Sequence, residues 1–345
     1  MNLSYDIIVI GAGPAGLACG RVAAENGLKV LVLERSRTIG KKICAGGITR
    51  NGLIKKLPGY VAEREFSRQH IYSRFQKAEV TAKTPIIATV NRIKLGSYMA
   101  DMAIQSGAEI RTSSMVTNIS PGEISVLNKD NGRVEMIRYR HLVGADGSSS
   151  MVRRYLGIPR TFMGVGINYQ ISADLKKMEW HFNTSLFNNG YCWVFPHAGT
   201  VSVGAYANRT SIKPSLLREN LLDWAEQRGI VLSAQKATAE FINYDYRGWH
   251  FDNFFLAGDA AGFASGLTGE GIYPALVSGE AIGRYIASPK SPRPEISQLV
   301  ATHKKHKRLV SISGRSHFVC TVLSELLIFA LRTGLVKFDK IEMAN

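Results

Sequence analysis

A glycine-rich loop directly after an apolar strand constrains the fold of this chain more than any other feature. The loop is Gly11-Ala-Gly-Pro-Ala-Gly16; it follows the apolar run Tyr5 to Ile10, and a second run from Leu28 to Leu33 ends in Glu34. The first glycine allows a tight turn, the second lets a pyrophosphate approach the backbone, and the third lets the next helix pack closely. That helix directs its N-terminus at the phosphates, and Glu34 follows at the spacing that a ribose contact needs. The sequence therefore predicts a Rossmann-like α/β domain that binds a dinucleotide.

Length and composition indicate a folded protein with more than one domain. Of the 345 residues, 45% are hydrophobic and 20% are charged, which allows a sizeable core. The four cysteines, Cys19, Cys44, Cys192 and Cys320, are scattered without a Cys-x-x-Cys pair. We therefore expect reduced thiols, no metal site and a cytoplasmic protein. The first strand begins close to Met1, so we expect no secretory signal.

The net charge of +16 predicts an anionic partner. Basic residues cluster at Lys41-Lys42, Lys55-Lys56, Arg153-Arg154, Lys176-Lys177 and His303 to Arg308. A solvated face accounts for any single cluster, but their sum favours phospholipid surfaces, phosphorylated substrates or acidic proteins. We expect no nucleic acid partner, because no recognition helix, zinc finger or aromatic ribonucleoprotein pattern accompanies the charge.

A segment near the C-terminus predicts an amphipathic helix. Apolar residues recur at helical spacing from Phe318 to Leu331, interrupted by Ser324 and Glu325, and the run is too short to span a membrane. Two interpretations remain open: the helix packs against the protein body, or its apolar face enters lipid while nearby basic residues meet headgroups.

Three downstream segments continue the α/β pattern. Residues 91–103 predict a helix that leads through Gly107 into a strand over 108–111. Residues 141–147 predict a strand that closes in a Gly-Ala-Asp-Gly turn, and residues 253–262 a strand that ends at Gly-Asp-Ala-Ala-Gly. Asp259 in that turn is suited to accept hydrogen bonds from cofactor hydroxyl groups. Gly269 and Gly271 open the next helix and would bring its positive end close to a ring system that must hold negative charge.

The middle of the chain predicts an antiparallel sheet that covers the cofactor. Residues 165–174, 179–186, 190–195 and 200–207 are the predicted strands. Because side chains alternate along a strand, Tyr191, Trp193 and Phe195 project to one face. That face is either plain sheet core or the wall of a narrow slot for a long apolar ligand.

Together these motifs carry a resemblance to a known family. The glycine loop, the Gly-Ala-Asp-Gly turn and the Gly-Asp-Ala-Ala-Gly segment, in this order, resemble the three FAD-contacting motifs of the para-hydroxybenzoate hydroxylase superfamily of flavoproteins. Within it, Lys42-Ile-Cys-Ala-Gly-Gly-Ile-Thr49 resembles the Cys-Gly-Gly-Gly-Leu-Thr segment of the geranylgeranyl reductase family. Tyr191-Cys-Trp-Val-Phe-Pro196 matches that family's Tyr-x-Trp-x-Phe-Pro motif at every fixed position. Ala45 departs from the family's more usual glycine, which affects the local backbone geometry.

The resemblance implies a set of residues that contact FAD. The segment Cys44 to Gly47 should run beside the isoalloxazine ring, and Val116 stands where the family's backbone holds the adenine. The predicted cofactor-binding residues are Gly11, Gly13, Ala15, Gly16, Glu34, Arg35, Cys44, Ala45, Gly46, Gly47, Arg92, Val116, Asp259, Gly269, Gly271 and Ile272.

The resemblance also implies a substrate site. Tyr191, Trp193, Phe195 and Pro196 are the predicted substrate-binding residues, and Cys44, Tyr191 and Trp193 the predicted catalytic ones. For Cys44 two roles stay open: it shapes substrate approach or assists proton delivery, or it is a small side chain packed against the ring.

The function implied is an FAD-dependent reductase that saturates isoprenoid double bonds of a lipid, quinone or pigment precursor by hydride transfer from reduced flavin. Only one dinucleotide fingerprint is present, so electrons would come from transiently bound NAD(P)H or from ferredoxin or flavodoxin. The alternatives are an FAD-dependent monooxygenase and an electron-transfer flavoprotein that reduces quinones. A halogenase is disfavoured, because its Trp-x-Trp-x-Ile-Pro pattern differs from Tyr191 to Pro196 at two fixed positions.

We predict an FAD-binding domain formed by residues 1–60, 90–160 and 250–288, interleaved with a mostly antiparallel sheet domain formed by residues 61–89 and 161–249. A proline-rich linker at 288–294 leads into a helical segment, and this C-terminal part comprises residues 289–345.

Overall fold

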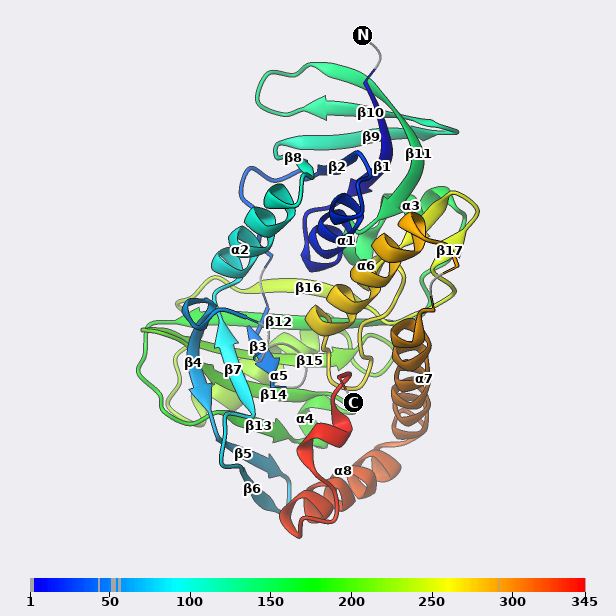
Figure 1. The fold of residues 1–345 in the computed structure, drawn as a ribbon. Helices are drawn as coiled ribbons and strands as arrows, with labels where there is room; N and C mark the ends of the chain where they lie inside the picture. The colour runs from blue at the N-terminus through cyan, green and yellow to red at the C-terminus, as the bar shows by residue number, and fades with distance from the viewer. Residues whose placement is uncertain (1–2, 43, 51–53, 55–56, 291, 345) are drawn as a thin grey trace.

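The computed structural model describes residues 3–42, 44–50, 54, 57–290 and 292–344, so the basic pair Lys55-Lys56 lies outside the described part. A nucleotide-binding half carries the N-terminus, and a broad sheet crosses the other half (Figure 1). The chain passes between the halves repeatedly, which agrees with the predicted interleaved architecture.

The sheet of the first half is built around its N-terminal strand. The strand order is β17 (His250–Phe251), β18 (Phe254–Leu256), β11 (Val134–Gly144), β1 (Ser4–Ile10), β2 (Val30–Leu33) and β8 (Glu109–Arg111). From β18 to β8 neighbouring strands are parallel. Two further strands, β10 (Glu123–Asn128) and β9 (Ser114–Ser120), extend β11 in antiparallel fashion.

Strand β1 is buried on both faces, as expected for a central parallel strand. Ile7 and Val9 pack with residues of the helices α1 (Pro14–Glu25), α2 (Arg92–Gln105) and α6 (Ile272–Ala287). Ile8 and Ile10 pack on the opposite face, in the cluster that contains Ile124 of β10. The predicted helix over 91–103 and strand over 108–111 are therefore confirmed as α2 and β8.

The second sheet has the order β16 (Thr238–Asn243), β12 (Met163–Ile171), β15 (Val201–Asn208), β14 (Tyr191–Pro196), β13 (Glu179–Phe182), β5 (Arg68–Ser73) and β6 (Lys77–Thr81). All neighbours are antiparallel except β13 and β5. The prediction of a strand over 179–186 is wrong in its second half: β13 stops at Phe182. There Asn183 accepts a hydrogen bond from the Ser185 amide and begins the short helix α4 (Thr184–Phe187).

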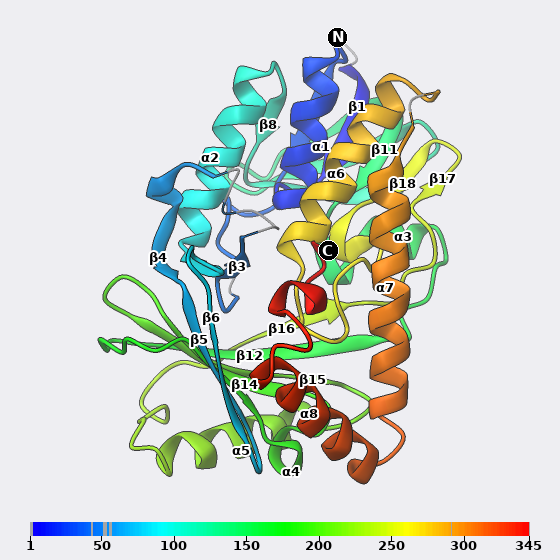
Figure 2. The ribbon, with the colours of Figure 1, turned by 60° about the horizontal axis from the view of Figure 1, so that its bottom comes forward.

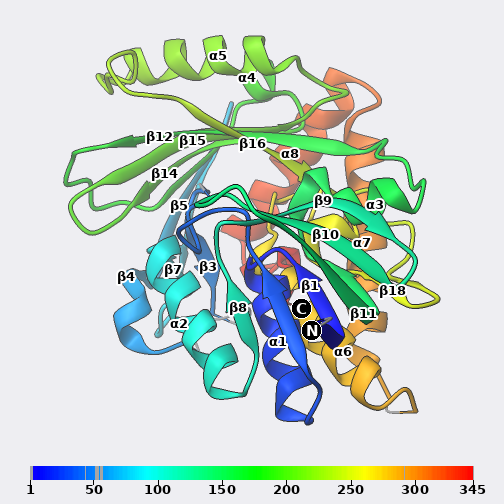
Figure 3. The same cartoon turned by 90° about the horizontal axis from the view of Figure 1, so that it is seen from above.

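The two faces of this sheet pack against different partners. Helix α5 (Pro214–Glu226) covers the face that carries Cys192 and Val194, and Figure 3 shows it on the side away from the nucleotide-binding half. Tyr191, Trp193 and Phe195 form a separate cluster on the other face. The predicted alternation is therefore confirmed. A small third sheet, with order β3 (Gly47–Thr49), β7 (Ile87–Val90) and β4 (Ala62–Phe66), lies beside the second sheet and below α2 in Figure 1.

The C-terminal part connects both halves. Helix α7 (Pro294–Ser313) runs along one side of the molecule to α8 (His317–Arg332), beyond which the chain turns back towards its centre (Figure 2). The turn contains the 3-10 helix η5 (Phe338–Ile341), and Met343 packs into the core of the first half. Among the described helices, none is both long enough and apolar enough to cross a membrane.

Some residues of the predicted basic clusters are buried and do not lie on the solvated surface. Arg153 on α3 (Met151–Tyr155) is 1% exposed, and His303 and His306 point into the protein from α7. Lys304, Lys305 and Arg308 remain on the outer face of that helix. Part of the formal positive charge is therefore internal, and the surface excess comes from the remaining lysines and arginines.

Candidate functional site

A cavity of about 910 Å³ extends between the two halves. One end is formed by the glycine loop, and the other is walled by aromatic and aliphatic side chains of the second sheet and α8. The cavity thus joins a polar, glycine-rich region to an apolar one within a single space.

The glycine loop has the close contacts that its sequence predicts. Gly11 has a φ of +103°, and a Cβ on Gly16 would lie 1.9 Å from the Gly11 carbonyl oxygen. A Cβ on Gly13 would have no atom within 4 Å, so this position faces open space in the cavity. The loop and the N-terminus of α1 therefore leave a cradle in which a phosphate can approach the backbone.

Two charged side chains near this cradle fit the rest of a dinucleotide. Glu34 at the end of β2 accepts hydrogen bonds from the amides of Ala12, at 3.0 Å, and Ser36, at 2.9 Å, which holds its carboxylate at the cavity wall. Arg92 at the start of α2 also lines the cavity, and its Nε and Nη1 atoms are buried without a partner in the described structure. A buried guanidinium with unpaired donors fits an anionic group such as a phosphate.

Asp259 in the 3-10 helix η4 (Gly258–Ala260) lies where the two halves meet. Its Oδ2 atom is 3.1 Å from Nζ of Lys42 and accepts a hydrogen bond from the Ser148 hydroxyl at 3.2 Å. The Asp259 carboxylate, with Glu240 as a further contributor, raises the pKa of Lys42 although burial opposes the shift. Lys42 is thus an ammonium group at the mouth of the cavity, and its side chain, 41% exposed, also belongs to the surface cluster that the sequence predicts.

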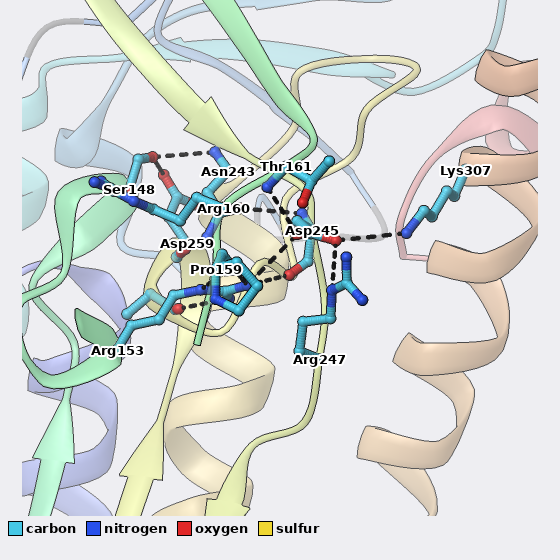
Figure 4. Close-up of polar contacts among 11 residues, drawn as sticks. Ser148, Arg153, Pro159, Arg160, Thr161, Asn243, Asp245, Arg247, Asp259 and Lys307 are labelled. Atoms are coloured by element: carbon cyan, nitrogen blue, oxygen red, sulfur yellow. Dashed lines mark hydrogen bonds and ion pairs between the residues drawn. The ribbon is translucent and has the colours of Figure 1, made fainter. Parts of the chain in front are cut away.

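A buried network holds the Asp259 turn in place (Figure 4). Arg153 donates hydrogen bonds to the carbonyl oxygens of Pro159, Ala260 and Asp245. The Asp245 carboxylate accepts from the Thr161 amide, pairs with Arg247 at 3.0 Å and lies 3.6 Å from Lys307 of α7. Burial alone would raise the pKa of Asp245, but these hydrogen bonds and charges together lower it. The network anchors η4 to the second sheet and to α7.

The segment Cys44 to Gly47 is fixed by a histidine that sequence reasoning did not select. His197 is 7% exposed and lies 3.0 Å, through Nε2, from the Ala45 carbonyl oxygen. Gly46 has a φ of +77°, and a Cβ there would lie 2.6 Å from the His197 ring. The segment therefore packs directly against the end of β14, and Ala45 is accommodated with its side chain beside the aromatic cluster.

The apolar end of the cavity is an aromatic wall. Tyr191, Trp193 and Phe195 are joined there by Trp180 of β13, whose ring centroid lies 5.3 Å from that of Tyr191 and 4.7 Å from that of Phe195. The Trp193 indole donates to the Ser202 hydroxyl, and the Tyr191 hydroxyl donates to the Thr268 carbonyl. Both polar tips are thus satisfied within the protein, and the faces of the rings line the cavity.

Two carboxyl groups line the same cavity between its polar and apolar ends. Burial raises the pKa of Glu270 to about 7, and its Oε2 atom accepts a hydrogen bond from the Met343 amide at 2.8 Å. Burial, followed by the charge of Glu270, raises the pKa of Glu342 to about 8. Glu342 is 4% exposed, and its Oε2 atom has no partner in the described structure. The C-terminal segment thus contributes a titratable group to the cavity.

Most of the predicted site residues meet at this cavity. Gly16 is beneath the loop and Pro196 is not in the lining; the Pro196 carbonyl accepts a hydrogen bond from Thr89 instead. Sequence reasoning missed Lys42, Trp180, His197, Glu270 and Glu342. Glu270 could have been predicted, because it lies between Gly269 and Gly271, which the sequence already indicates as cofactor contacts. The predicted residues that line the cavity are Gly11, Gly13, Ala15, Glu34, Arg35, Cys44, Ala45, Gly46, Gly47, Arg92, Val116, Tyr191, Trp193, Phe195, Asp259, Gly269, Gly271 and Ile272.

Comparisons with known proteins agree with a flavin site. A family model described as "FAD binding domain" matches residues 4–288. The digeranylgeranylglycerophospholipid reductase 2 of Methanothermobacter thermautotrophicus is 28% identical over 303 residues, which cover 83% of this chain and 78% of that protein. The digeranylgeranylglycerophospholipid reductase of Methanococcus vannielii is 27% identical over 333 residues, covering 89% of this chain and 84% of that protein.

Solved structures share the fold. A geranylgeranyl bacteriochlorophyll reductase-like protein from Thermoplasma acidophilum superposes with a TM-score of 0.82 at 19% identity, covering 100% of this chain and 96% of that one. Flavin-dependent halogenases and a probable FAD-dependent monooxygenase align at TM-scores near 0.65. At these identities the structural likeness concerns the fold alone, and it spans the whole chain.

Proposed function

Because this chain belongs to the FAD-binding domain family and is an FAD-dependent oxidoreductase of the geranylgeranyl reductase-like type, we propose that it saturates isoprenoid double bonds of a lipid, quinone or pigment precursor. The observation that carries the proposal is the single cavity that runs from the dinucleotide cradle to the aromatic wall and on to α8. FAD is its cofactor, and a reductase of long apolar chains needs both ends of this space.

The polar end is suited to hold the cofactor through groups that are already placed. The cradle at Gly13 and the unpaired guanidinium of Arg92 would bind the pyrophosphate, and Glu34 would bind ribose hydroxyls. When bound, reduced FAD would supply hydride to one carbon of the double bond. Asp259 and Lys42 would contact the cofactor's hydroxyl and ring atoms from the junction of the halves.

The apolar end is suited to orient the alkene and exclude water. Cys44, Tyr191 and Trp193 line the cavity beside the ring position implied by the Cys44 to Gly47 segment. Further along, Ile71, Phe182 and Leu331 line it with hydrocarbon. An extended isoprenoid chain has no hydrogen-bonding groups, so a slot of aromatic and aliphatic faces is the chemistry that recognises it.

A second part of the proposal is that the protein works at the surface of an anionic membrane, on its cytoplasmic side. On the outer face of α8 the side chains of Phe318, Val322, Leu326 and Phe329 are 75%, 39%, 58% and 43% exposed, and their spacing places them in one stripe. We call these four residues the α8 stripe.

The α8 stripe has features of a lipid-binding surface. Arg315, Arg332 and Lys337 flank it and are exposed. The opposite side of the same helix carries Leu327 and Leu331 of the cavity wall. One helix therefore separates an exposed apolar surface from the substrate cavity, which suits a substrate that is delivered from a bilayer.

For the electron source we propose transient NAD(P)H binding at the flavin face, or a carrier such as ferredoxin or flavodoxin. The chain has one dinucleotide fingerprint, at Gly11 to Gly16, and it is used by FAD. An exchangeable donor fits this arrangement better than a second resident nucleotide.

The test is an anaerobic single turnover. The protein loaded with FAD is reduced with dithionite, mixed with geranylgeranyl diphosphate or a geranylgeranylated lipid, and followed by flavin absorbance and product mass. Reoxidation with a gain of two hydrogens per double bond is expected. Flavin that stays reduced until oxygen is admitted would favour a monooxygenase, and reduction of quinone headgroups with intact alkenes would favour an electron-transfer flavoprotein. A Cys44→Ala variant that keeps FAD and full turnover would limit Cys44 to lining the ring.

A further inference from the structure

Saturating a double bond requires a proton as well as a hydride, and the proposed function leaves open which side chain supplies it. The geometry points to Glu270 and Glu342: we propose that Glu270 donates this proton to the substrate carbon, and that Glu342 positions and replenishes it. The inference rests on the proposed function, since it names the proton donor of that reaction.

Glu270 lies where the two ends of the cavity meet. A Cβ on the preceding Gly269 would lie 3.3 Å from the Tyr206 ring and 3.6 Å from the Tyr191 hydroxyl. A Cβ on the following Gly271 would lie 3.1 Å from Oδ1 of Asp259. The residue is therefore flanked by the aromatic wall on one side and by the proposed cofactor contact on the other, which is where a reacting double bond must lie.

The second carboxyl comes from the far end of the chain. The Met343 amide donates to Glu270 at 2.8 Å, so the backbone beside Glu342 is bound directly to the Glu270 side chain. Glu342 is buried, lines the same cavity and feels the Glu270 charge. Thr49 of β3 is a hydrogen-bonding neighbour of Glu342, whereas Glu342 Oε2 remains unpartnered among the described residues. A buried carboxyl oxygen without a donor is expected to be satisfied by a proton.

The charged and titratable neighbours do not compensate a second negative charge. Tyr191 of β14 and Tyr273 of α6 interact with Glu270, and Asp339 of η5 interacts with Glu342. All three are neutral or acidic. The charge of Glu270 therefore disfavours ionisation of Glu342, because no positive group among these neighbours offsets it. Burial favours the protonated form of Glu270, which is the form that a proton donor needs.

Reduced FAD would supply the hydride, and with it both electrons, for the new C–H bond at one alkene carbon. The O–H bond of Glu270 breaks as a C–H bond forms at the other carbon. The electron pair of the O–H bond stays on the Glu270 carboxylate, which the Met343 amide stabilises. A proton from solvent then returns by way of Glu342. Asp339 is half-buried, its charge acts on Glu342, and its Oδ1 atom is also unpartnered among the described residues, so we take it as the next group on this path.

The alternative is a purely structural role, in which Glu270 and Glu342 only attach the C-terminal segment to the rest of the protein. A fastening role predicts that Glu270→Gln lowers the melting temperature and leaves turnover per bound FAD unchanged. Proton donation predicts the opposite pattern, since glutamine can accept the Met343 amide hydrogen bond but cannot give up a proton.

The experiment uses the full chain with FAD bound. The first readout needs no substrate: pH-difference infrared spectra should contain the C=O band of a protonated carboxyl that disappears as the pH rises through about 7 to 8. In Glu270→Gln the band should weaken, because only the Glu342 carboxyl remains to contribute to it. In Glu342→Gln the remaining carboxyl should titrate at lower pH, because the like charge is gone. Glu219→Gln, which removes an exposed carboxyl on α5, should leave the band unchanged.

The second readout is the anaerobic single turnover with geranylgeranyl diphosphate. Glu270→Gln should slow flavin reoxidation by about 10² to 10⁴-fold, Glu270→Asp should recover part of the rate, and Glu342→Gln should shift the pH profile to lower pH. Wild-type rates in Glu270→Gln, or a protonated-carboxyl band that is as strong in the double variant Glu270→Gln, Glu342→Gln as in wild type, would overturn this inference and leave the reductase proposal intact. Wild-type protein that reduces no alkene overturns the proposed function and, with it, the donation step.

Discussion

Glu63 and His197 lie with Oε2 of the carboxylate 2.6 Å from Nδ1 of the imidazole. The other ring nitrogen reaches the Ala45 carbonyl, so the pair connects β4, the end of β14 and the segment that the flavin ring should face. The imidazole is thus held through both of its ring nitrogens, and Glu63 and the Ala45 carbonyl together set its orientation.

We predict that His197→Ala loosens the Cys44 to Gly47 segment. It removes the hydrogen bond to Ala45 and opens space beside Gly46, at a cost of about 1 to 3 kcal/mol in the free energy of unfolding. The absorbance spectrum of bound FAD should shift, and kcat should fall more than KM rises. Glu63→Gln is the matched control with a smaller effect, because the amide can still bond the ring. An unaltered spectrum in His197→Ala would remove the positioning role.

Substitution of two glycines in the same loop should separate folding from cofactor binding. Gly16→Ala places a methyl group 1.9 Å from the Gly11 carbonyl oxygen, so the apoprotein should melt at a lower temperature and bind little FAD. Gly13→Ala meets no protein atom, so its apoprotein should melt like the wild type while FAD binds at least about tenfold more weakly, about 1.4 kcal/mol. Calorimetry of apoprotein and FAD titration measure the two effects. Equal FAD affinity in Gly13→Ala and wild type would contradict the phosphate cradle.

The α8 stripe should carry membrane binding. Replacing Phe318, Leu326 and Phe329 with serine removes three large apolar groups, each worth about 1.5 to 3 kcal/mol when buried. Binding to vesicles that contain anionic lipid should fall by about two orders of magnitude or more, as measured by co-sedimentation. Val231→Ser, at a 68% exposed position beyond α5, is the control and should bind normally. If the wild-type protein does not bind anionic vesicles even at low salt, the proposal of membrane binding is wrong.

The inner side of α8 should limit the length of the substrate chain. Leu327 lines the cavity, whereas Val322 on the same helix is 39% exposed. Leu327→Trp fills the far end of the cavity and should lower the single-turnover rate with twenty-carbon chains more than with ten-carbon chains. Val322→Trp adds the same side chain outside and should change neither rate in detergent. If both variants have the same chain-length profile, the substrate does not reach α8.

Stability should depend on pH through the two cavity carboxyls. Their pKa values in the folded protein, about 7 and about 8, lie above the ordinary value of 4.5, so the folded state binds protons more tightly than the unfolded state. Their contribution to the free energy of unfolding is therefore complete below about pH 4.5 and is lost as the pH rises to about 8. Melting temperatures across this range should fall less in the double variant Glu270→Gln, Glu342→Gln than in wild type. Parallel curves would contradict the raised values.

Local patterns were sufficient to predict the α/β fold. The run Tyr5 to Ile10, the spacing of Gly11, Gly13 and Gly16, and Glu34 are determined by backbone conformation and close approach, which leave a direct mark in the sequence. The same holds for the alternation that places Tyr191, Trp193 and Phe195 on one face. The predicted domain boundaries and site roles stay predictions.

The missed residues depend on contacts between distant segments. Glu342 lies 72 positions after Glu270, and its burial follows only from the way the chain returns beyond α8. The ion pair of Lys42 could not be predicted, because its partner Asp259 is 217 positions away. The predicted strand over 179–186 extends past Phe182 because the apolar Leu186 favours a strand there, whereas the Asn183 side chain caps the helix α4 instead.

The first helix of the chain and one of its later helices are in backbone contact. A Cβ on Gly279 of α6 would lie 2.1 Å from the Ala15 carbonyl of α1, and one on Gly283 would lie 2.8 Å from that of Cys19. The two helices meet through glycine, so neither reaches its final packing alone. During synthesis the nucleotide cradle therefore waits for α6, which ends at Ala287, to leave the ribosome. Until then the nascent chain exposes the apolar faces of α1 and β1, so we expect it to retain flavin only after α6 has been synthesised.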